Sequence, residues 1–264
     1  MGSAKYSLSE RTALVRMSLH LMSAVRSDKL YLADPMMQLE EAPLHHCNIS
    51  DILRIADYAQ TANSSTVGFS AVYVASQNNH LQVLQALIAS DADVNIANNK
   101  GDTPLLFACS IGHALVTQEL LAAGANKNHT NSNGTSAVLI ASQNNHLQVL
   151  QALIAADADV NIANNEGVYP LLIACEIGHV LVTQELLAAG ANKNCTDTNG
   201  ISAVYAASQN NHLQVLQTLI AADADVNIAN NEGLMKSFQN NHLQVLEALI
   251  SADADVNIAN NGGL

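Results

Sequence analysis

Short apolar groups, separated by glycine, asparagine and aspartate, recur along residues 67–264. Within residues 100–132 the apolar positions form two such groups, each with the spacing of one helix face. We therefore expect two short helices in this stretch, the second of them over 113–122. The expected apolar face of this second helix consists of Leu115, Val116, Leu120 and Leu121.

Polar residues, proline and glycine mark the ends of both helices. Thr103 precedes the first helix, where its hydroxyl can accept a hydrogen bond from a free amide, and Pro104 suits the first helical position. Gly112 separates the two helices, and Gly124 is expected to end the second one as a left-handed residue. The asparagine-rich stretch that follows has turn chemistry, which predicts a projecting hairpin.

The same pattern returns at a fixed period, which a series of histidines makes visible. These are His80, His113, His146, His179, His212 and His242. The first five are evenly spaced along the chain, and the last interval is shorter by three. A fixed period of about 33 residues indicates stacked supersecondary units, each burying its apolar face against its neighbours.

Residues 100–132 match a known repeat at many positions. The matching residues are Gly101, Thr103, Pro104, Leu105, Ala108, Gly112, His113, Val116, Leu120, Leu121, Gly124, Ala125, Asn126 and Asn128. The segment resembles the ankyrin repeat, and six consecutive units share the resemblance. We number them one to six, at 67–99, 100–132, 133–165, 166–198, 199–231 and 232–264. The resemblance implies an all-α helix-turn-helix solenoid with projecting hairpin loops.

The units are of two kinds. Units two and four share LVTQELLAAGANKN, whereas the others share NNHLQVLQALIA or close variants, so the longer period comprises two units. The odd units begin their first helix with Ser-Ala instead of Thr-Pro, at Ser70, Ser136 and Ser202. Residues expected at positive φ in place of glycine are Asn79, Asn145, Asn211, Asn241, Asp91, Asp157, Asp223 and Asp253.

The two ends of the chain differ from the repeats between them. Residues 1–66 lack the repeat signature, and their apolar periodicity predicts a helical N-terminal segment, either a cap on unit one or a degenerate repeat. A targeting segment is an alternative, since 11–26 carries three arginines and no acid; disorder or a partner-binding helix are others. Unit six is three residues short before His242, so its first helix should be short or irregular.

The second helix of unit six keeps the internal apolar pattern but has no following unit in this sequence. Terminal repeats normally need a polar outer face. We therefore expect this end to be the least stable part of the array and to expose Leu and Ile side chains. It could self-associate weakly, or belong to a longer array.

Composition and charge narrow the range of partners. The chain is 49% hydrophobic and 3% aromatic, and its net charge is −13. Residues 67–264 carry four basic and sixteen acidic groups, a balance that disfavours nucleic acid and anionic membranes and favours neutral or basic protein partners. Improved solubility is an equally simple explanation of the acidity. No apolar run approaches the ~18 residues of a membrane span.

No residue pattern predicts catalysis, a metal or a cofactor. Histidines one layer apart would be about 10 Å apart, too far for one zinc ion. The Asp-Ala-Asp-Val-Asn segments lack the glycine and glutamate that a calcium loop requires. Cys109 and Cys175 lie two layers apart, too far for a disulfide, and four cysteines without a framework favour a reducing, cytoplasmic location.

The ankyrin resemblance implies that a partner contacts the hairpin tips and the exposed side of the first helices, on a concave face. In this chain those positions include Lys100, Asp102, Ser110, Ile111, Thr135, Gln143, Glu166, Val168, Glu176, Ile177, Ile201 and Gln209. Among them, Ile111, Val168, Ile177 and Ile201 are expected to form an exposed apolar strip. One column, Phe69, Asp102, Thr135, Val168 and Ile201, holds five different residues, although drift at an unconstrained surface would look the same.

These observations predict a non-catalytic protein-protein interaction scaffold. The alternative is a targeting or effector protein, whose N-terminal segment acts while the repeats select the partner.

Overall fold

The computed structural model describes residues 70–228 and 242–254. These residues form eleven α-helices and no strand. The helices are α3 (Ala71–Gln77), α4 (Leu81–Ile88), α5 (Pro104–Ile111), α6 (Ala114–Ala122), α7 (Ala137–Gln143), α8 (Leu147–Ala155), α9 (Pro170–Ile177), α10 (Val180–Ala188), α11 (Ala203–Gln209), α12 (Leu213–Ala221) and α14 (Leu243–Ser251). Isolated bridges join Thr130 to Ser136 and Thr196 to Ser202.

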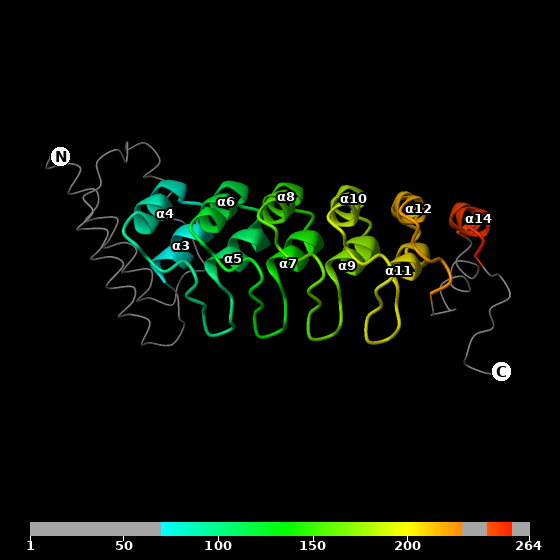
Figure 1. Cartoon of the computed structure of the whole chain (residues 1–264), viewed down its shortest axis with the longest axis horizontal. Coiled ribbons are helices and arrows are strands. Elements are labelled where there is room, and N and C mark those ends of the chain that lie inside the picture. The colour runs from blue at the N-terminus through cyan, green and yellow to red at the C-terminus, as the bar shows by residue number, and fades with distance from the viewer. Residues whose placement is uncertain (1–69, 229–241, 255–264) are drawn as a thin grey trace, which may run out of the picture.

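The helices stack in two parallel rows, with hairpins projecting from one side (Figure 1). The odd-numbered helices α3 to α11 are the first helices of units one to five, and α4 to α12 with α14 are the second helices. In units one to five, each helix packs against its partner in the same unit and against the corresponding helices of adjacent units, and α14 packs against α12. The predicted all-α solenoid with projecting hairpin loops is confirmed.

Hydroxyl groups cap most of the first helices, as the sequence predicted. The Thr103 hydroxyl accepts from the Leu106 amide at 3.3 Å, and the Ser136 hydroxyl accepts from the Leu139 amide at 3.2 Å. Ser70 and Ser202 cap α3 and α11 in the same way. Tyr169 occupies this position in unit four, and its side chain makes no capping hydrogen bond.

The predicted left-handed positions also occur. Gly112 and Gly124 have φ of 88° and 85°. The non-glycine residues with positive φ are Asn79, Asn145, Asn211, Asp91, Asp157, Asp223 and Asp253. Asparagine and aspartate are the L-residues that best tolerate this conformation, so the odd units, and unit six at Asp253, keep the backbone path without glycine.

One prediction about the second helix was wrong. The helix α6 begins at Ala114, with His113 at its N-cap, and it buries Val116, Thr117 and Leu120. Leu115 is 63% exposed instead of sharing that face. At about 100° per residue, Val116, Thr117 and Leu120 lie within one arc of about 100° on α6. Leu115 falls about 100° beyond Val116, on the side away from Thr117, so it faces solvent.

Asparagine side chains connect successive units through the loops that follow the second helices. Asn95 Oδ1 accepts from the Asn126 amide at 2.7 Å, and Asn128 Oδ1 accepts from the Asp159 amide at 2.9 Å. The Asn161 and Asn194 side chains repeat the contact in the next units. These bonds satisfy loop amides and fix the distance between neighbouring layers.

At the C-terminal end, α14 exposes Leu243 and Ile250 by 62% and 52%. The corresponding Leu213 and Ile220 in α12 are only partly exposed. The expectation that the last helix exposes leucine and isoleucine is therefore confirmed. Predictions for 1–66, the first helix of unit six, Phe69 and Asn241 fall outside the described residues.

Candidate functional site: the inner face

The first helices and the hairpins form one side of the stack, which we call the inner face. In α5, Phe107 and Ser110 are partly exposed and Ile111 is 43% exposed, whereas the other residues are buried. Their spacing of three and four residues places them on one side of the helix. The opposite side of α5 packs against α6 and the neighbouring first helices α3 and α7.

Unit four repeats this arrangement. Ile173 is partly exposed, Glu176 is exposed, and Ile177 is 43% exposed, the same fraction as Ile111. The odd units carry asparagine where Ile111 and Ile177 stand, at Asn78, Asn144 and Asn210. Exposed isoleucine therefore occurs on every second layer of the inner face among the described residues.

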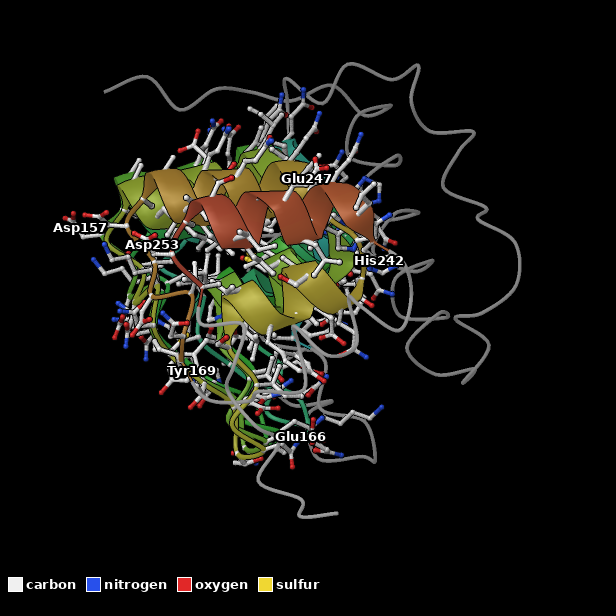
Figure 2. All side chains as sticks on the ribbon, turned by 90° about the vertical axis from the view of Figure 1, so that its right-hand side faces the viewer. Asp157, Glu166, Tyr169, His242, Glu247 and Asp253 are labelled. Atoms are coloured by element: carbon white, nitrogen blue, oxygen red, sulfur yellow. The ribbon has the colours of Figure 1, made fainter. Side chains whose placement is uncertain are left out.

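The hairpin tips add charge to this face. Lys100 and Glu166 are exposed at equivalent tip positions of units two and four. Figure 2, which views the stack end-on, shows Glu166 at the hairpin end and Tyr169 nearer the helices. Neighbouring tips are bonded: the Ser132 hydroxyl donates to the Lys100 carbonyl at 2.6 Å, and the Thr198 hydroxyl donates to the Glu166 carbonyl at 3.0 Å.

None of the twelve residues predicted to contact a partner is buried. Those classed as exposed are Lys100, Ile111, Gln143, Glu166, Glu176 and Ile177. Those partly exposed are Asp102, Ser110, Thr135, Val168, Ile201 and Gln209. The Asp102 carboxylate is already engaged, because the Asn131 side-chain amide donates to it at 2.9 Å and the Asn98 amide at 3.4 Å.

The sequence prediction missed one column of this face. Phe107, Ile140 and Ile173 are partly exposed and lie one helical turn before Ile111, Asn144 and Ile177, respectively. The Phe107 ring also contacts the Tyr73 ring of unit one in a tilted arrangement, with ring centroids 5.0 Å apart and an interplanar angle of 50°. The signal available in the sequence was the i, i+4 spacing of Phe107 from the residue already identified, Ile111.

The repeated histidines have a structural role. The His113 and His179 side chains donate through Nδ1 to the Ser76 and Ser142 carbonyls of the preceding units, both at 3.0 Å. His146 donates through Nε2 to the Ser110 carbonyl at 3.2 Å. No group of three His, Cys, Asp or Glu side chains in 70–228 and 242–254 is placed to hold a metal ion.

The described cysteines are free and buried. Burial raises the pKa of both Cys109 and Cys175 to about 12, and that of Cys195 to about 11. A thiol acts as a nucleophile only as its thiolate, so these three side chains are packed groups rather than reactive ones.

Three segments match the family model for ankyrin repeats, at residues 21–130, 71–164 and 171–260. Together they extend over most of the chain. The chain belongs to the ankyrin repeat family. Ankyrin repeats are generally protein-protein interaction modules and non-catalytic scaffolds.

An ankyrin repeat domain from Acinetobacter baumannii, solved by crystallography at 1.00 Å, has a similar structure. The TM-score is 0.66 at 25% sequence identity, and the match covers 69% of this chain and 97% of the other. No curated protein matches the sequence significantly. Within the described part of this ankyrin repeat protein, no helix is both long and apolar enough to cross a membrane.

Proposed function

We propose that this ankyrin repeat protein is a non-catalytic scaffold that binds a partner protein through its inner face. One observation carries the proposal: Ile111 and Ile177 are each 43% exposed at equivalent places, where neighbouring units carry asparagine. The fold tolerates a polar residue at this position, so isoleucine is not needed there for packing. Exposed apolar side chains grouped on one face are typical of a binding surface.

The charge of the array supports a neutral or basic partner rather than nucleic acid or an anionic membrane. Residues 67–264 hold sixteen acidic and four basic groups. Two of those four, Lys127 and Lys193, donate to the carbonyls of Ala156 and Ala222 at the ends of second helices. Such a surface attracts cationic partners and speeds their encounter.

We further propose that residues 1–66 continue or cap the array at 67–264. The family-model match that begins at residue 21 supports a degenerate repeat in this segment. A cytoplasmic location is proposed from the three free, buried thiols at Cys109, Cys175 and Cys195.

The test compares two double variants of the full chain as bait for affinity capture. Ile111→Asn with Ile177→Asn places the asparagine of the odd units on the inner face. Leu115→Gln with Leu181→Gln is the matched control: these leucines are 63% and 58% exposed on second helices, and the odd units carry glutamine there.

We expect the isoleucine variant to lose specific partners that the wild type and the leucine variant both retain. Circular dichroism should give the same helix content for all three proteins, because each substitution copies a residue used in a neighbouring unit. If the leucine variant loses the partner and the isoleucine variant keeps it, the binding surface is the second-helix side and the proposal is wrong.

A further inference from the structure

We propose that the inner face binds an extended peptide segment with two apolar anchor side chains six residues apart, one at unit two and one at unit four, and with a basic residue beside the anchor at unit four. This inference rests on the proposed function and adds the chemistry and spacing of the partner.

The anchor positions are two equivalent apolar pairs. Phe107 with Ile111, and Ile173 with Ile177, each occupy i and i+4 on the exposed side of a first helix. Side chains at this spacing are neighbours, so each pair offers a continuous apolar patch. On the same side, unit three has the partly exposed Ile140 but follows it with Gln143 and Asn144, which are both exposed, so it lacks the second apolar residue that completes each pair.

The layer spacing sets the distance between the anchors. The two pairs belong to units two and four, so they lie two layers apart in the stack. Packed helices lie about 8–10 Å apart, so the pairs are separated by roughly 16–20 Å. An extended chain advances about 3.3 Å per residue, and six residues span about 20 Å. Side chains alternate between faces of a strand, so an odd spacing would direct one anchor away from the surface.

An extended segment suits this face better than a helix. A helix has satisfied its own backbone groups, whereas an extended segment offers free amides and carbonyls. The exposed side-chain amide of Gln143 lies between the two apolar pairs and can bond with such a backbone. The apolar pairs supply the anchors and unit three supplies polar contacts.

Charge distinguishes the two ends of the site. Unit two has Lys100 and Ser110 where unit four has Glu166 and Glu176. The Asp102 carboxylate of unit two, where unit four has Val168, accepts from the Asn131 and Asn98 side chains. Because its charge is opposite to that of Lys100, unit four still carries the more negative net charge on this face. In unit four, Glu176 lies between Ile173 and Ile177 on the same side of α9 and is exposed. A lysine or arginine next to the second anchor would pair with this carboxylate. The same charge difference would fix the direction in which the peptide lies.

The test is a random library of displayed 12-residue peptides, selected on the full-length protein. We expect enrichment of sequences that have two large apolar residues six positions apart and a Lys or Arg adjacent to one of them. A synthetic peptide of the enriched pattern should bind at least about tenfold more weakly to the Ile111→Asn, Ile177→Asn variant, since each exposed isoleucine loses an apolar contact. It should bind equally to the Leu115→Gln, Leu181→Gln control.

Two further measurements test spacing and charge. Moving the second anchor by one residue should abolish the gain over a peptide with a single anchor. Glu176→Ser, which copies Ser110, should weaken binding of the basic peptide by about two- to fivefold and reduce its salt dependence.

The outcomes separate this inference from the proposed function. If a captured protein partner needs Ile111 and Ile177 but selection enriches no spaced anchors, or enriches them equally on the asparagine variant, the peptide inference is wrong and the inner-face function stands. If neither protein partner nor peptide depends on these isoleucines, both are wrong.

Discussion

The even and odd units of the array fill the same interior space with different pairs of side chains. In unit two, Cys109 of the first helix faces Thr117 of the second, with Sγ and Oγ1 3.9 Å apart, and both are buried. In unit three the equivalent residues are Ser142 and Leu150, also buried. Cys109 is larger than Ser142, whereas Thr117 is smaller than Leu150. Each unit type therefore combines side chains whose sizes match within that unit.

The contact between the residue that separates the two helices of a unit and the histidine of the next unit, which we call the junction, also alternates between two forms. A Cβ atom on Gly112 would lie 2.7 Å from Nδ1 of His146, so the imidazole of unit three fills the space that glycine leaves. Asn145 has a Cβ atom at the equivalent place, and the next histidine, His179, bonds the preceding unit through Nδ1 instead of Nε2. The comparison teaches that the structural module is the pair of units, not the single repeat.

The largest expected effect comes from removing one whole module. Deleting residues 133–198 joins unit two to unit five, so Gly112 meets His212, an odd-unit histidine like His146. We expect a shorter, folded array that unfolds cooperatively. Its stability should fall by about 2–5 kcal/mol, a proportionate share of the total for a domain.

Urea melts followed by circular dichroism measure this change. Helix content per residue should stay near that of the full chain. Loss of helix at room temperature in the deletion protein would show that the units do not behave as a linear array.

A second prediction exchanges the internal pairs. Thr117→Leu places the odd-unit residue opposite the even-unit Cys109, and overpacking should cost about 1–3 kcal/mol. Adding Cys109→Ser recreates the Ser-Leu pair of unit three and should recover most of that loss. The equivalent exchange at Cys175 and Thr183 in unit four provides an independent repeat. Additive effects of the two substitutions in the melts would mean that the pairs are not matched.

The third prediction concerns the junction. Gly112→Asn copies the odd units, and the φ of 88° at this position alone would suit asparagine tolerably. The added Cβ displaces His146, however, so we expect a loss of about 1–2 kcal/mol. The reverse change, Asn145→Gly, displaces no histidine, because the imidazole of the next unit does not occupy this space. It should alter the free energy of unfolding by less than about 0.5 kcal/mol. Equal effects of the two substitutions in urea melts would contradict the alternation of junctions.

Much of this arrangement could be predicted from the sequence, because period, caps and left-handed positions depend on local residue chemistry. Thr103, Pro104 and Gly112 all behave as their types indicate. On the exposed side of α5, Ser110 and Ile111 were predicted from the family resemblance, but Phe107 was not identified from the apolar pattern. The α5 sequence PLLFACSI is apolar almost throughout, so periodicity does not separate Phe107 from its buried neighbours.

The alternating histidine contacts lay equally beyond sequence reasoning. His146, which follows a unit with glycine at the junction, bonds through Nε2. His179, which follows a unit with asparagine there, bonds through Nδ1. That difference depends on a contact between adjacent units, which are one full repeat apart along the chain, and no local pattern encodes it.

The fourth prediction, a gain in stability, concerns the cap of unit four, which differs from that of unit two. Tyr169 precedes α9 without a capping hydrogen bond, whereas Thr103 caps α5. Tyr169→Thr should let the hydroxyl accept from the Leu172 amide and stabilise the protein by about 0.5–1 kcal/mol. Tyr169→Ala is the matched control, because it removes the ring without supplying a cap. The two variants would be compared by thermal melts, and a Tm for Tyr169→Thr no higher than that for Tyr169→Ala would show that the cap adds nothing in unit four.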